Sequence, residues 1–148
     1  MITDSLGLLK AEIQVNHKRA RAYVRALTEP SETIVSLFPL RYSRGAWNAL
    51  KEIGVFSDLD DARLKYYLFR MNEATLVANK NLRKLQLAYL EDTDEGNLDL
   101  LVETAQQETR LVLRVLDRVL QMLRDVPVPD FAFEDPFESN LTLQKDDE

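Results

Sequence analysis

Apolar residues recur at helical spacing along the first part of the chain. Over residues 5–27 one stripe of positions steps alternately by three and four residues. The stripe consists of Leu6, Leu9, Ile13, Asn16, Ala20, Tyr23 and Leu27. This is the heptad pattern by which helices pack against one another, and Asn16 is its polar member. Pro30 follows, which predicts that the helix ends before that residue.

Two further long helices are predicted in the second half of the chain. Residues 57–92 contain no glycine or proline, and Ser57 and Asp58 are their candidate N-terminal caps. The apolar stripe of this segment comprises Leu64, Leu68, Met71, Thr75, Ala78, Leu82, Leu85 and Tyr89. The sequence DTDEGN predicts a turn, after which residues 98–124 form the last helix. Its stripe comprises Leu101, Ala105, Thr109, Val112, Leu116, Val119 and Leu123.

A short helix is predicted over residues 44–52. Ser43 is its candidate N-cap and Gly54 its candidate C-terminal stop. Trp47, the one tryptophan of the chain, shares a face of this helix with apolar neighbours, so we interpret it as a core anchor whose indole N–H needs an acceptor. The preceding residues 31–43 are apolar without a period and are expected to lie across the end of the bundle.

These elements predict an all-α fold, an antiparallel bundle of three long helices plus one short Trp-bearing helix. The bundle takes up residues 1–125 and forms one domain, as expected for a chain of 148 residues. Residues 126–148 hold three of the five prolines and show no helical period. This segment is acidic, and we predict a disordered or loosely docked tail.

Charge is distributed unevenly along the chain. Residues 1–88 carry 14 Lys+Arg against 9 Asp+Glu, whereas residues 89–148 carry 5 against 16. The simplest interpretation is that the two halves face each other. A basic stripe of Lys18, Arg21 and Arg25 on the first helix, with further cations on the third, could instead bind nucleic acid. The sequence pI of about 4.9 argues against nucleic acid, because the tail would compete for the same face.

Several chemistries are excluded or disfavoured by composition. The chain has no cysteine and a single histidine, His17, so a zinc site built from His and Cys within one chain is excluded. The four glycines are isolated, and no phosphate-binding glycine loop is present. Acidic clusters at 58–61 and 91–95 occupy predicted helix starts and turns. We therefore expect a non-catalytic protein without metal or cofactor.

One short stretch raises an alternative. The N-terminus of the predicted short helix, Ser43–Trp47, presents free N–H groups, and Arg41 and Arg44 flank it, so this site could hold a small anion or a nucleotide phosphate. The competing interpretation is structural: Ser43 caps the helix and the arginines are solvated. Asn16 is interpreted as a buried amide that sets helix register, with Asn72 and Asn79 as candidate partners.

No run of about 18 apolar residues and no secretory signal is present, so a soluble, cytoplasmic protein is expected. Membrane association is then expected only through a partner. Self-association through exposed heptads is an open alternative. The tail carries Phe131, Phe133 and Phe137 among acids and prolines, which is typical of a short docking motif. Whether it docks on its own bundle or binds another protein is left open by the sequence.

Three segments together resemble a pattern of uncharacterised bacterial and archaeal all-helical domains. They are LLKAEIQVN, with Glu12 and Asn16 four residues apart, SRGAWNALKEIGVFSDL, and LKYYLFRMN. The resemblance covers residues 5–90, and many such domains are parts of membrane-anchored proteins; this chain lacks a spanning segment. It implies that Glu12, Asn16, Trp47, Tyr67 and Asn72 lie together, and it implies no activity.

We therefore expect an interaction or regulatory module with an unknown protein partner. Its predicted binding surfaces are the aromatic acidic tail and the basic face of the first and third long helices. Residues Asn16, Trp47, Tyr67 and Asn72 are expected in the structural core.

Overall fold

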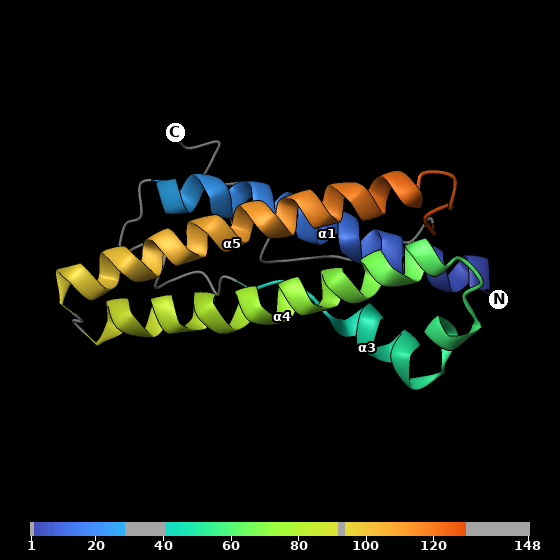
Figure 1. Ribbon diagram of the computed structural model, residues 1–148, viewed down its shortest axis with the longest axis horizontal. Coiled ribbons are helices and arrows are strands. Elements are labelled where there is room, and N and C mark those ends of the chain that lie inside the picture. The colour runs from blue at the N-terminus through green and yellow to red at the C-terminus, as the bar shows by residue number, and fades with distance from the viewer. Residues whose placement is uncertain (1, 29–40, 92–93, 130–148) are drawn as a thin grey trace.

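The structure is a computed structural model that describes residues 2–28, 41–91 and 94–129. Its helices are α1 (Ile2–Thr28), α3 (Gly45–Glu52), α4 (Ala62–Leu90) and α5 (Glu95–Met122), with a 3₁₀ turn at Val55–Asp58 (Figure 1). The described part of the chain contains no strand. The all-α prediction is therefore confirmed.

Two of the predicted helix starts are wrong by a few residues. Helix α4 begins at Ala62, because the carboxylate of Asp61 accepts hydrogen bonds from the N–H groups of Arg63 and Leu64, both at 3.0 Å. The predicted caps Ser57 and Asp58 lie instead in the 3₁₀ turn. Helix α5 begins at Glu95, inside the predicted turn, since Asp94 caps it through Asn97 N–H at 3.0 Å. The predicted stop at Gly54 is confirmed by its left-handed φ of 78°.

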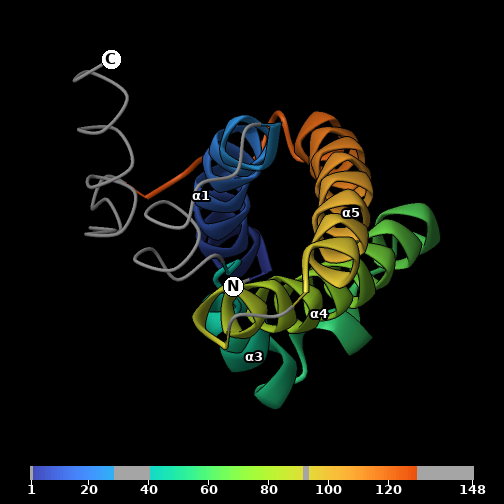
Figure 2. The same cartoon turned by 90° about the vertical axis from the view of Figure 1, so that its left-hand side faces the viewer.

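Seen end-on, the three long helices surround a shared core, with α3 outside it next to α4 and α1 (Figure 2). Helix α5 runs antiparallel to both α1 and α4 and packs against both. Helices α1 and α4 run parallel to each other (Figure 1). A parallel pair needs a return connection along the bundle, whose described part begins with residues 41–44 and continues into α3. They run between the helices, so the expectation that this segment crosses the end of the bundle is wrong for residues 41–43.

The apolar stripes predicted from the sequence form the core. All seven stripe positions of α1 are buried, and so are those of α4 and α5 except for Tyr89 and Leu101, which are half-buried. The stripe threonines satisfy their hydroxyls within their own helices. Thr75 donates to Met71 O at 3.0 Å, and Thr109 donates to Ala105 O at 2.7 Å. Both can therefore lie among apolar side chains without leaving an unpaired polar group.

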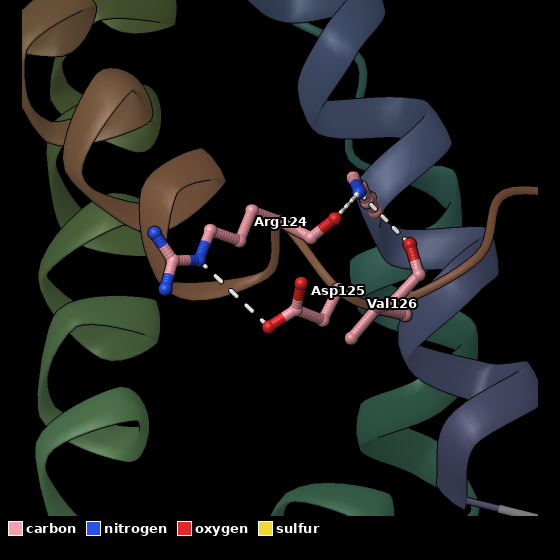
Figure 3. Close-up of polar contacts among 4 residues, drawn as sticks. Arg124, Asp125 and Val126 are labelled. Atoms are coloured by element: carbon pink, nitrogen blue, oxygen red, sulfur yellow. Dashed lines mark hydrogen bonds and ion pairs between the residues drawn. The ribbon is translucent and has the colours of Figure 1, made fainter.

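The C-terminal end of α5 is fastened to α1. The ammonium group of Lys10 donates to the carbonyl oxygens of Arg124 at 3.1 Å and Val126 at 2.8 Å (Figure 3). Both are carbonyls beyond the last turn of a helix, where a cation is favourable. Residues 126–129 then pass so close to Gly7 that a Cβ there would overlap Pro127 O. The first residues of the predicted tail therefore lie against α1, while residues 130–148 lie outside the described residues.

The described part of the chain has no helix with the length and apolar character needed to cross a membrane.

Two glycine-to-alanine variants test the close contact at Gly7. In an α-helix alanine is favoured over glycine by about 0.5–1 kcal/mol. Gly96→Ala on α5 should show such a gain, because its Cβ would meet only Asp94 Oδ1 at an ordinary 3.5 Å. Gly7→Ala should instead lower the unfolding free energy, measured by urea titration with circular dichroism, since it pushes Pro127 away. Equal stabilisation by both variants would show that residues 126–129 do not need the close approach.

Candidate functional site

Residues 41–44, here called segment 41–44, have no regular secondary structure and are held between α1 and α4 by side-chain hydrogen bonds from both helices. Its residues turn alternately to the two helices: the backbone of Arg41 and Ser43 bonds to side chains of α1, and that of Tyr42 bonds to α4. Arg44 then reaches α4 with its side chain, donating to Asn72 Oδ1 at 2.5 Å. Side chains of both helices therefore hold the segment in place.

Two asparagine side chains hold this segment from opposite sides. The amide of Asn16 on α1 accepts from Ser43 N–H at 2.8 Å and donates to Ser43 O at 2.9 Å. The amide of Asn79 on α4 accepts from Tyr42 N–H at 2.6 Å and donates to Tyr42 O at 3.1 Å. Each amide therefore satisfies both backbone groups of one residue, as a neighbouring β-strand would. The predicted partners of Asn16 were Asn72 and Asn79; its actual partner is the backbone of Ser43.

The backbone of Arg41 is satisfied by two side chains of α1. Tyr23 accepts from Arg41 N–H at 3.1 Å and donates its own hydroxyl to Arg41 O at 2.8 Å. Arg19, also buried, donates to the same carbonyl at 3.1 Å. The four groups Arg19, Tyr23, Asn16 and Asn79 therefore leave no backbone N–H or C=O of residues 41–43 without a partner.

A buried carboxylate caps helix α3 from a different helix. Glu12 on α1 is only 5% exposed, and its two oxygens accept from Ala46 N–H at 2.6 Å and Trp47 N–H at 3.1 Å. The hydroxyl of Ser43 also donates to this carboxylate, at 3.2 Å. The N-cap residue is Arg44, whose side chain makes no capping bond. The predicted cap Ser43 therefore acts one step away, on the group that does the capping.

The Ser43–Trp47 anion site is thus filled by the protein's own carboxylate. The N–H groups that an external anion would use are bonded to Glu12, which also suits the positive end of the helix dipole. The two arginines do not converge there. Arg44 turns to Asn72, and Arg41 is exposed, with only its backbone bonded in the described contacts.

Trp47 is a core residue, 2% exposed. Its ring stacks on Phe56 with centroids 4.2 Å apart, and the edge of Phe69 meets it at 5.6 Å. The predicted acceptor for its indole N–H is not found among the described residues. Of the five residues expected together from the family resemblance, the structure gathers Glu12, Asn16, Trp47 and Asn72 around segment 43–47. Tyr67 lies apart, where Arg118 of α5 stands over its ring at 5.5 Å.

Tyr42 carries the segment into the core between the helices. Its ring is buried, packs against Tyr23 at 5.4 Å between centroids, and places its hydroxyl beside Thr109 of α5. Burial raises the pKa of the Tyr42 phenol above its usual range, and the neighbouring Tyr23 raises it further. Tyr42 is therefore a buried, neutral residue that connects the segment to α1 and α5 through its side chain and to α4 through its backbone.

The basic residues singled out in the sequence form two surfaces instead of one. Lys18, Arg21 and Arg25 are exposed on the side of α1 opposite its buried stripe. The exposed cations of α4 lie away from the α4 stripe and comprise Arg63, Arg70, Lys80, Arg83 and Lys84. Because each set points away from the shared core, the expected basic face common to both helices is not continuous.

The surface of α4 opposite its buried stripe, here called the α4 outer face, combines these cations with large apolar side chains. Exposed fractions are 57% for Tyr66, 44% for Leu76 and 52% for Val77, and Phe69, Leu87 and Leu90 are exposed as well. Helix α4 has six Lys+Arg and a single acid, Glu73. Exposed apolar residues of this kind, repeated along one helix and mixed with charges of one sign, are a feature of binding surfaces.

The remaining predicted binding residues, Phe131, Phe133 and Phe137, lie outside the described residues. His17, interpreted as a surface histidine, lies at the edge of the α1–α5 contact and pairs with Asp117 at 2.5 Å. In the described ranges no three His, Asp or Glu side chains are grouped so that they could hold a metal ion.

Comparison of the chain with models of known protein families, with curated proteins and with solved structures found no match to any of them. The family resemblance noted in the sequence therefore stays a prediction.

Sequence reasoning missed Glu12 as a cap and Tyr23, Arg19 and Asn79 as partners of the segment. One signal was present: Glu12 and Asn16 are polar residues one helical turn apart on the buried side of α1. Polar residues on a buried stripe need partners, and an irregular connection supplies unpaired backbone groups.

Replacing the capping carboxylate should destabilise the protein. Glu12→Gln loses the charge and turns an amide N–H₂ towards backbone donors, so we expect a loss of about 1–3 kcal/mol in unfolding free energy. Urea unfolding followed by the fluorescence of Trp47 measures it. The matched control is Glu103→Gln, an exposed acid on α5, which should change stability by less than about 0.5 kcal/mol. A loss no greater than that of the control would mean that Glu12 does not hold α3.

The buried phenol of Tyr42 predicts a specific weakness at alkaline pH. An unfolded phenol ionises near pH 10, whereas the folded one stays neutral, so its contribution to stability is full below pH 10 and is lost as the pH rises further. At pH 10.5 this loss is about 0.8 kcal/mol from the linkage relation. Comparing urea unfolding at pH 8 and 10.5, Tyr42→Phe should lose less stability than the native protein. The exposed control Tyr66→Phe should lose as much as the native protein, and identical losses in all three would exclude Tyr42 as the source.

Proposed function

We propose that this protein is a non-catalytic interaction module that binds acidic, aromatic-containing peptide segments of partner proteins through the α4 outer face. The observation that carries this proposal is the composition of that face, in which Tyr66, Phe69 and Val77 are exposed beside five cations. A ligand with both aromatic rings and carboxylates would cover the apolar surface and pair the charges. Recognition of acidic motifs by clusters of basic side chains is a recurring mode of peptide binding.

Charge and apolar exposure favour the α4 outer face over the basic residues of α1 as the binding site for such a ligand. The α4 outer face has one exposed acid among its cations, so an acidic ligand meets little repulsion there. The basic residues Lys18, Arg21 and Arg25 of α1 also offer cations, but no large apolar residue of α1 is exposed in the described part of the chain. That stripe lacks the apolar area that gives peptide complexes most of their stability.

The anion or nucleotide site at Ser43–Trp47 is a less favoured second proposal. An external phosphate would have to displace Glu12 and leave that carboxylate buried and unpaired, which is costly. No contact of the described residues favours it.

Selection from a library of displayed random peptides against the full chain tests the proposed function. Selected peptides should be rich in Asp, Glu and aromatic residues, and their affinity should fall with added salt. Binding measured by fluorescence anisotropy should weaken about tenfold or more, about 1.4 kcal/mol, in a Lys80→Glu/Arg83→Glu variant. The matched control, Arg21→Glu/Arg25→Glu on α1, should bind normally. Equal weakening in both variants, or selection of peptides without acids, would contradict the α4 outer face as the binding site.

A further inference from the structure

The acidic aromatic chemistry that suits the α4 outer face is present in this chain itself. Residues 130–148 contain seven Asp+Glu against one Lys, together with Phe131, Phe133 and Phe137. We propose that residues 130–148 dock on the α4 outer face of the same molecule and compete there with outside ligands. This inference rests on the proposed function, since it names an occupant and a regulation of the same surface.

The tail starts at the end of the bundle where α1 and α4 begin. Lys10 and the close approach at Gly7 hold residues 126–129 against the first turns of α1. Trp47 contacts both Glu12 of α1 and Phe69 of α4, so these two residues lie at one level of the parallel helices. Gly7 precedes Glu12 by five residues, or about 8 Å of helix, which places it near the level of the first turns of α4.

The remaining chain is long enough to reach and follow the face. Nineteen residues span about 60 Å when extended, whereas α4, with 29 residues, is about 44 Å long. Phe131, Phe133 and Phe137 follow Pro129 by two to eight residues, or about 7–26 Å of extended chain, so Phe137 can reach the first turns of α4 at Tyr66 and Phe69. The acidic residues after Phe137 can extend further along the face towards Lys80 and Arg83. A tethered segment also acts at high effective concentration, so weak contacts are sufficient to keep it bound.

Charge favours the tail over a second copy of the bundle as the group that binds the α4 outer face. Two α4 outer faces brought together would oppose Arg70, Lys80, Arg83 and Lys84 of one copy with the same cations of the other. Like charges across an interface are unfavourable, whereas the acids of the tail pair with them. The phenylalanines of the tail also favour α4 over α1. The basic surface of α1 offers cations but no exposed large apolar residue in the described range.

The absence of cysteine allows a direct test on the full chain. Ser139→Cys, in the tail, accepts one nitroxide spin label, and the ¹⁵N-labelled protein then reports which backbone amides lie near that label. We expect the amide signals of residues 66–84 to lose most of their intensity, and those of residues 18–25 to keep theirs. Broadening centred on α1, or on no helix, would overturn the proposal.

Variants and mixtures identify what produces the signal. Replacing Phe131, Phe133 and Phe137 by alanine should restore the α4 signals, and so should Lys80→Glu/Arg83→Glu, while Arg21→Glu/Arg25→Glu should not. The tail variant changes residues outside the described core, so loss of folding is not its expected effect. In a further sample, protein that carries the spin label but no ¹⁵N is mixed with ¹⁵N-labelled protein that carries no spin label. No amide signal should broaden in this mixture; broadening of the α4 signals would assign the face to a second copy. Co-sedimentation with anionic phospholipid vesicles that needs Lys80 and Arg83 but not the phenylalanines would assign the face to a membrane and overturn the proposal.

The same variants separate this inference from the proposed function. If the tail docks, the triple phenylalanine-to-alanine variant should bind the selected acidic peptides more tightly than the native chain. If the tail does not dock but those peptides still need Lys80 and Arg83, the inference fails and the proposed function stands. If the tail broadens α4 and no peptide is selected even against the triple phenylalanine-to-alanine variant, docking of the tail stands, whereas the proposed function and the competition fail.

Discussion

The bundle depends on the satisfaction of one short stretch of buried backbone. Helices α1 and α4 run in the same direction, so the chain must return along the bundle between them before α4 begins. Residues 41–43 make part of this return with no neighbouring strand, and buried N–H and C=O groups without partners would be costly there. The amides of Asn16 and Asn79, with the hydroxyl of Tyr23, take the place of that strand.

These contacts also specify one arrangement among many apolar alternatives. Heptad stripes alone tolerate sliding of one helix past another, because one leucine resembles the next. An amide that exchanges two bonds with one particular residue does not tolerate such sliding. A shift of segment 41–44 by one position would turn Tyr42 out of the core, since alternate residues of an extended chain point to opposite sides. Glu12 adds a further constraint by fixing where α3 begins relative to α1.

The sequence predicted the parts of this fold that burial alone determines. The stripes from Leu6 to Leu27 and from Leu64 to Leu85 were identified because a helix with one buried face must repeat its apolar residues every three to four positions. The same pattern does not depend on direction, so the parallel arrangement of α1 and α4 could not be derived from it. The role of Glu12 could not be predicted either, because the residue type alone does not distinguish a buried capping carboxylate from an acid on the surface. Gly54 was predictable, since a left-handed residue after a helix strongly favours glycine.

The order of the elements along the chain has a consequence for synthesis. During translation α1 leaves the ribosome before α5, against which it packs most extensively. Until α5 is made, α1 can pack only against segment 41–44 and α3, which hold the partners of Asn16 and Glu12. Helices α4 and α5 are neighbours in sequence and can pair as a local hairpin, which is the faster kind of contact to form. We therefore expect the hairpin of α4 and α5 to form before α1 packs against α5, so that much of the apolar side of α1 stays exposed to chaperones until α5 has been made.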